Sequence, residues 1–191
     1  MRITEEWLLE HEAPEPGAEV LCRLAPEGCT LAEAVGLCCD EERCDWATWL
    51  YSEAAKALPK PVLCRLAGRR ARAVQHLWPE EQRRALEAGV VMAERVAAGE
   101  AVPDQDLEAT EAEWRAQATM AWATERWTAW AAAATAWAVA GTAVWTPAGW
   151  AAAAAGWAVE VADSPAAKRA SWVEAATELE AEVDALEAVA R

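Results

Sequence analysis

The chain has 191 residues, of which 54% are hydrophobic, and it carries a formal net charge of -15 at pH 7. This length and composition allow one ample hydrophobic core or two small ones, which excludes an intrinsically disordered chain. The acidic balance argues against binding to duplex nucleic acid, because that requires Lys and Arg to neutralise phosphates. The acidic start of the sequence lacks the basic and Leu-rich segments of a signal peptide, so we expect a cytoplasmic protein.

The first part of the chain holds two clear helix starts. Thr4 can act as the N-cap of a helix that ends before Pro14. Thr30 and Glu33 have the spacing of a capping box, in which each residue bonds the other's backbone N–H. They predict a second, short helix that ends near Cys39.

Three more helices are predicted up to residue 99. Asp45 is a candidate N-cap for a helix that stops at the proline break of residues 59–61. An apolar face at helical spacing then extends over residues 62–77. Pro79 stands at the first position of the next predicted helix, which Gly99 ends.

The second half of the chain is also helical in pattern. A long helix is predicted from Pro103 to about residue 140, and Pro147 and Pro165, each preceded by a hydroxyl residue, begin two more. Alternating strand patterns are absent from the sequence. We therefore predict an all-α protein, an elongated bundle or solenoid-like stack of about six to eight helices. Its N-terminal part would span residues 1–101 and an Ala/Trp-rich part residues 102–191, unless the two form one continuous domain.

Two charged surfaces are candidate binding sites. One is basic, because Arg65, Arg69 and Arg72 recur at helical spacing and could pair with neighbouring Glu side chains or hold an anion. The other is acidic and would suit a basic partner. The candidate acidic residues are Asp104, Asp106, Glu108, Glu111, Glu174, Glu178 and Glu182.

An uncharged tract covers residues 127–159 and consists mainly of Ala and Trp. Because Ala adds little volume, we expect the Trp rings to supply most of the contact area and, in the main, to fill the core. A membrane span is disfavoured because Leu, Ile and Phe are scarce in the tract. The rings at its charged entrance could present a cation and an aromatic face together. This candidate binding site contains Trp114, Arg115, Trp122, Arg126, Trp127 and Trp130.

The six cysteines lie in apolar, helical patterns, so the sequence predicts reduced thiols packed in the interior. Their spacing lacks the paired C-x2-C knuckles of zinc sites, and we expect neither a metal nor a cofactor. The two histidines have no nucleophile or carboxylate motif around them. The sequence therefore predicts a protein that is not an enzyme.

Three stretches and the Ala-rich tail resemble the immunity proteins similar to immunity protein five, a helical family of bacteria and phages. The stretches are EWLLEHEA (6–13), DWATWL (45–50) and ALEAGVVMAERVAAG (85–99). The resemblance implies a cytosolic protein that neutralises a partner toxin by binding it, without catalytic residues. The acidic faces suit such a role, because acidic inhibitors attract basic targets and block their phosphate-binding surfaces.

Two other functions would use the same residues. The Trp rings and the stripe of Arg65, Arg69 and Arg72 could trap a nucleotide-type ligand by stacking and by bidentate phosphate contacts. The Trp and Ala faces could instead join copies of the chain into homo-oligomers, since small residues permit close helix approach.

Overall fold

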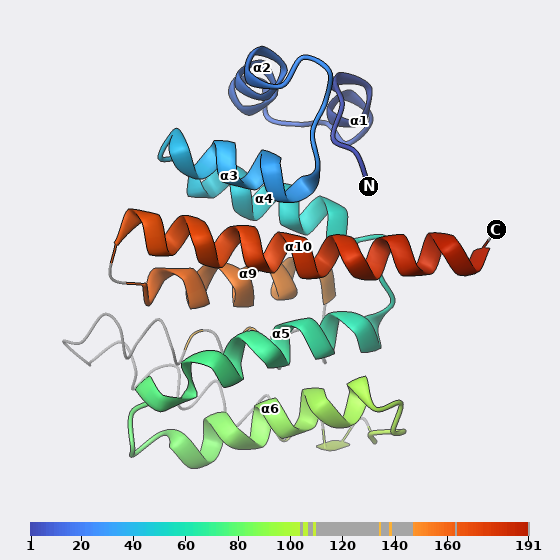
Figure 1. The fold of residues 1–191 in the computed structure, drawn as a ribbon. Coiled ribbons are helices and arrows are strands. Elements are labelled where there is room, and N and C mark those ends of the chain that lie inside the picture. The colour runs from blue at the N-terminus through green and yellow to red at the C-terminus, as the bar shows by residue number, and fades with distance from the viewer. Residues whose placement is uncertain are drawn as a thin grey trace.

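The computed structural model describes residues 1–103, 105–106, 109, 134, 138, 147–162 and 164–190. Its regular elements in these ranges are helices (Figure 1), which confirms the all-α prediction. They are α1 (Glu5–Glu10), α2 (Glu15–Leu24), α3 (Leu31–Asp40), α4 (Cys44–Ala55), α5 (Lys60–Val74), the 3-10 turn η1 (Gln75–Leu77), α6 (Arg83–Ala97), α9 (Pro147–Glu160) and α10 (Pro165–Ala190). An isolated antiparallel bridge joins Ile3 to Cys29.

The helices stack in layers, and the order of the layers differs from the order of the chain (Figure 1). The α1–α2 pair forms one end of the stack and lies next to α3 and α4, while α6 lies at the other end beside α5. The C-terminal pair occupies the middle, because α9 packs against both α4 and α5 and α10 packs against α3. Two helices that are adjacent in sequence, α4 and α5, are therefore separated by helices from the end of the chain.

A single hydrophobic cluster runs through these layers. It contains Leu50 of α4 and Leu63 of α5 together with Trp172 and Leu179 of α10, each with at most 2% of its surface exposed. The described parts of the predicted regions 1–101 and 102–191 thus share one core. This shared core favours the continuous-domain alternative.

The α9 helix buries its alanines rather than its tryptophans. Ala151, Ala154 and Ala155 are at most 1% exposed, whereas Trp150 and Trp157 are half-buried. Both rings pack against the edge of the core, so the expectation that Trp rings fill the core holds only in part for α9. The helix contacts α4, α5 and α10 at once, and small side chains allow its backbone to approach all three.

Some helix starts differ from the sequence predictions. The N-cap of α4 is Arg43 rather than Asp45, which lies in the first turn and forms a 2.8 Å ion pair with Arg43. Helix α6 begins at Arg83, and Pro79 belongs to the turn before it. Helix α2 was not predicted at all. In the described ranges, no helix combines the length and the apolar character needed to cross a membrane.

Candidate functional site

Most of the predicted Trp and acidic sites at the start of the Ala-rich tract lies outside the described residues. This applies to Trp114, Arg115, Trp122, Arg126, Trp127 and Trp130, and to Asp104, Glu108 and Glu111. Asp106 is described and lies, half-buried, in a short helical stretch. The basic stripe and the acidic residues of α10 are described in full.

The predicted basic stripe is divided between two helix contacts. Arg65 places Nη2 2.7 Å from Glu182 Oε2 and so joins α5 to α10. Arg72 points toward α6, where its Nε and Nη2 donate to the two oxygens of Glu94 at 2.8 and 2.9 Å and its Nη1 donates to Glu87 at 2.7 Å. These two guanidinium groups are thus already bound by carboxylates of the same chain.

Arg69 is the remaining member of the stripe. It is exposed and has no ion pair or hydrogen bond with a described residue. The stripe as folded therefore offers a phosphate one unpaired cation in place of three, and it does not form a ready anion site.

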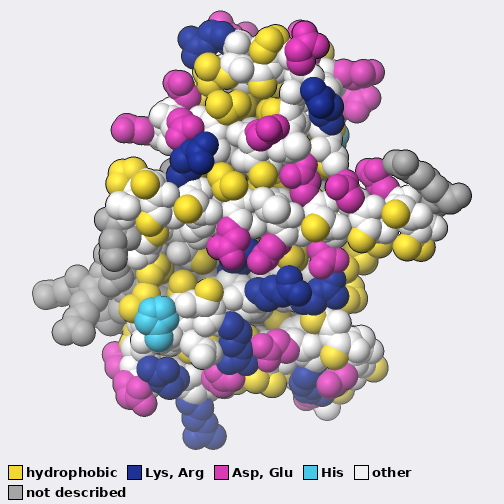
Figure 2. All heavy atoms as spheres, viewed as in Figure 1, with side chains coloured by type: hydrophobic (Ala, Val, Ile, Leu, Met, Phe, Trp, Pro, Cys, Tyr) yellow, Lys and Arg dark blue, Asp and Glu magenta, His cyan; other side chains and the backbone are white. Residues whose placement is uncertain are grey.

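The predicted acidic residues of α10 face the arginines of α5 (Figure 2). Glu178 Oε2 lies 2.6 Å from Nη2 of Arg70, whose side chain is only 8% exposed, and Glu174 lies 3.6 Å from Nη1 of the same residue. Glu182 binds Arg65 as described above. The acidic face of α10 is therefore largely neutralised within the molecule.

Another carboxylate of α10 has a structural task. Glu180 Oε1 accepts a hydrogen bond from the backbone N–H of Leu31 at 3.0 Å, at the first turn of α3. A negative charge at this end of a helix is favourable, because the N–H groups there are unpaired and carry partial positive charge. Glu180 thereby fastens α10 to α3.

Helices α1 and α2 form an open groove that no sequence prediction included. Its apolar surface includes Leu8 and Ala18, and the 73% exposed Leu9 stands at its side. The groove has a volume of about 470 Å3. Its lining residues are Glu5, Leu8, Leu9, Glu12, Ala13, Glu15, Ala18, Glu19 and Cys22. In Figure 2 this end of the molecule, at the top of the view, shows hydrophobic atoms among mostly acidic side chains.

The four carboxylates of this groove, which we call the acidic rim, are free to meet a partner. Glu5 and Glu12 come from the α1 side and Glu15 and Glu19 from α2, and all four are exposed. No Lys, Arg or His among the described residues forms an ion pair with any of them. The rim therefore differs from the acidic face of α10, whose charges are already paired.

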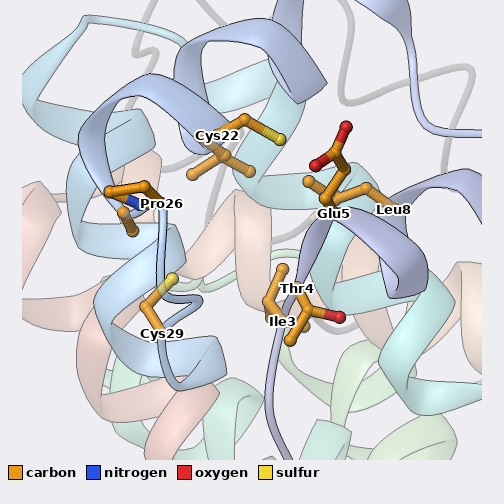
Figure 3. A pocket seen from close by; sticks show the side chains of 9 residues that line it. Ile3, Thr4, Glu5, Leu8, Cys22, Pro26 and Cys29 are labelled. Carbon is orange, nitrogen blue, oxygen red and sulfur yellow. The ribbon is translucent and has the colours of Figure 1, made fainter.

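A smaller cavity of about 100 Å3 lies between the same two helices and the bridge of Ile3 with Cys29 (Figure 3). The sulfur atoms of Cys22 and Cys29 both border it. Burial raises the pKa of the Cys29 thiol to about 11 and also raises the pKa of Cys22. Both groups stay protonated near neutral pH, which makes them poor nucleophiles and poor metal ligands.

A third hollow, of about 290 Å3, lies where α4, α9 and α10 meet. Trp157 and Trp172 contribute to its wall, together with Asp45 and Glu160. Its two acidic residues are occupied, because Asp45 binds Arg43 and Glu160 binds Lys168 at 2.7 Å. The hollow thus lacks unpaired charges that could select a ligand.

The chain matches no family model, no curated protein and no solved structure. The resemblance to immunity proteins therefore stays a prediction. Among the described residues, no three His, Cys, Asp or Glu side chains are grouped closely enough to hold a metal ion.

The groove was missed because α2 was missed, yet its pattern is visible in the sequence. Residues 5, 8, 9 and 12 and residues 15, 18, 19 and 22 repeat the same spacing of three, one and three on either side of Pro14. In a continuous helix that spacing places four residues on one face, although α1 ends at Glu10 and Glu12 lines the groove from the turn after it. Two such patterns separated by a short turn indicate two helices that lie side by side and share one surface.

Proposed function

We propose that this protein is a non-catalytic binding protein that captures a basic protein partner and neutralises it, acting in the cytoplasm. The observation that carries the proposal is the α1–α2 groove, in which an apolar surface is bordered by four exposed and unpaired carboxylates. Unpaired charges of one sign speed the encounter with a partner of opposite sign and select against partners of like sign. This is the physical basis on which acidic inhibitors bind basic toxins.

The groove supports this role better than the acidic face of α10. Glu178 and Glu182 would have to leave Arg70 and Arg65 before they could bind a partner's cations. Breaking the Arg70 pair would leave a charge unpaired in a buried position, which costs several kcal/mol. The acidic rim needs no such exchange. The binding surface therefore lies at the α1–α2 end of the stack.

The nucleotide-type ligand trap is less favoured by the contacts. Arg65 and Arg72 are bound to carboxylates, so a phosphate would compete with groups that are held in place by the fold.

Native mass spectrometry tests the proposed function. The protein would be purified at low salt from cells that co-express the proteins encoded beside it. We expect a complex with a basic protein that dissociates when salt is raised from about 0.05 M to about 0.5 M, because exposed charge pairs are screened at that ionic strength. A retained small molecule in place of a protein, or a complex that does not respond to salt, would contradict the proposal.

A further inference from the structure

We infer that the α1–α2 groove receives one amphipathic α-helix of the partner, with an apolar row that enters the groove and Lys or Arg residues on both sides of that row. The inference rests on the proposed function and specifies its site and the chemistry of its partner. It follows from the shape of the groove, from the placement of the rim charges and from the absence of a suitable occupant in the described part of this chain.

The shape of the groove fits one face of a helix. Its two walls are formed by α1, of 6 residues, and α2, of 10 residues. Helices of these lengths measure about 9 and 15 Å, so the groove can hold about two to three turns of an occupant. A segment of that length presents apolar side chains at positions i, i+3 or i+4, and i+7. A single exposed leucine is unremarkable on a protein surface, but Leu9 borders an open apolar groove that such side chains would cover.

The charges of the groove specify what stands beside the apolar row. Each side of the groove carries two carboxylates of the acidic rim, Glu5 and Glu12 from α1 and the turn after it, and Glu15 and Glu19 from α2. An occupant with cations on one side only would leave the opposite pair unneutralised. An apolar row with basic residues on both sides is the pattern of a basic amphipathic helix.

The described part of the chain offers no such helix from a second copy. Its most basic helix is α5, and Arg65, Arg70 and Arg72 of that helix are bound to Glu residues of α10 and α6. The α10 helix has two basic residues near its start, Lys168 and Arg169, which are bound to Glu160 and Asp40, and its charges from residue 174 onward are acidic. The acidic rim also repels the anionic headgroups of a lipid surface. A basic helix of a different protein is the occupant that satisfies both the apolar surface and the rim.

The test uses a fluorescent synthetic helix of Leu and Lys, with Leu at positions i, i+3, i+4 and i+7, and the full-length protein. A scrambled peptide of the same composition keeps the charge and lacks the apolar face. We expect the amphipathic peptide to bind roughly tenfold more tightly than the scrambled one in fluorescence anisotropy. The amphipathic peptide can bury a continuous apolar row in the groove, whereas the scrambled peptide has no such row. Equal binding of the two peptides would overturn the inference.

Matched variants locate the site. Leu9→Ser should weaken peptide binding about tenfold, whereas Val189→Ser, which removes a still more exposed apolar side chain from α10, should leave it unchanged. The double variant Glu12→Gln/Glu19→Gln should weaken binding and reduce its salt dependence. Its control, Glu6→Gln/Glu10→Gln, removes the same charge from exposed residues outside the groove. Equal losses for the two double variants would mean attraction by net charge alone and would overturn the inference.

The same variants separate this inference from the proposed function. A basic protein recovered in the native mass spectrum whose complex is unchanged by Leu9→Ser and by Glu12→Gln/Glu19→Gln would overturn the groove assignment and leave the proposed function standing. Peptide binding that responds to these variants, without any basic protein in the native spectrum, would support the groove and contradict the proposed function.

Discussion

Gly28 occupies a position that no other residue type could fill without strain. Its φ of +77° lies in the left-handed region, and a Cβ atom at this position would come within 2.8 Å of the carbonyl oxygen of Ile3. The bridge between Ile3 and Cys29 depends on this close approach, with N···O distances of 2.8 and 3.0 Å. Gly28 therefore controls how the start of the chain is held beneath the α1–α2 groove.

Replacement of Gly28 by Ala should destabilise the protein more than the same change at Gly99. Both residues have a positive φ, which costs a residue with a Cβ about 1 kcal/mol. Gly99 has no atom within 4 Å of the new Cβ, whereas Gly28 meets the Ile3 oxygen and must displace it. Urea unfolding should show a loss of about 1 kcal/mol for Gly99→Ala and at least about twice that for Gly28→Ala. Equal losses would show that the contact with Ile3 carries no cost.

At the scale of helices, local signals predicted well where they act within one turn. The capping box of Thr30 and Glu33 is present, with the Glu33 N–H donating to Thr30 Oγ1 at 3.1 Å and the Thr30 N–H donating to Glu33 Oε2 at 2.8 Å. Ser164 caps α10 by accepting from the Ala167 N–H at 3.2 Å. These bonds join residues three positions apart, so sequence spacing alone reveals them.

Helix α2 escaped prediction because its start reads as a break. Pro16 and Gly17 usually interrupt a helix, yet Pro16 lies in the first turn, where its missing N–H costs nothing. Gly17 lies against Trp46, and a Cβ atom there would be 3.1 Å from Cδ2 of the Trp ring. This glycine lets α2 approach α4, which is a tertiary requirement that local propensity does not contain. The groove was lost with the helix.

The carboxylate partners of the α5 arginines could not be predicted from local sequence either. Helical spacing placed Arg65, Arg69 and Arg72 near one another, but it could not show that Arg65 meets α10 while Arg72 meets α6. Arg70 was not singled out, although it is the most deeply buried arginine of the helix. Its importance comes from α10, whose residues lie about a hundred positions further along the chain.

Removal of Arg70 should destabilise the protein far more than removal of Arg65. The Arg70 side chain is 8% exposed and faces Glu178, whereas Arg65 is 42% exposed. Arg70→Ala leaves the Glu178 carboxylate without a cation at a buried atom, at a cost of roughly 3 kcal/mol, and Arg65→Ala should cost less than about 1 kcal/mol.

Chemical unfolding of the two variants measures this difference. The double variant Arg70→Met/Glu178→Leu should recover much of the loss, because well-packed apolar residues can replace a buried ion pair. A similar, small loss for Arg70→Ala and Arg65→Ala would show that the Arg70 pair is solvated.

At the scale of the molecule, the central layer is the part that sequence reasoning did not foresee. The predicted boundary near residue 101 followed from composition, since Ala and Trp dominate only after it. Packing does not follow composition here, because α9 lies between α4 and α5. No short sequence motif in α4, α5 or α9 indicates that these helices pack together. Their packing depends on how the surfaces of the whole helices fit.

A fragment of residues 1–101 should therefore fail to fold by itself. Without α9 and α10 it would expose Leu50 and Leu63 and leave Arg70 without its carboxylate partners. We expect weak helicity and no cooperative thermal transition in circular dichroism, in contrast to the full chain. A sharp transition in the fragment would instead support two separate domains.

The position of α9 and α10 also sets an order of events during synthesis. The helices at both ends of the stack, α1 to α6, leave the ribosome before the two helices that will lie between them. Until then α3 lacks the Glu180 carboxylate at its first turn, and the apolar faces of α4 and α5 have no cover. The nascent chain must keep these faces from aggregating until α9 and α10 are made, so a pause in translation before these helices would prolong the period of greatest exposure.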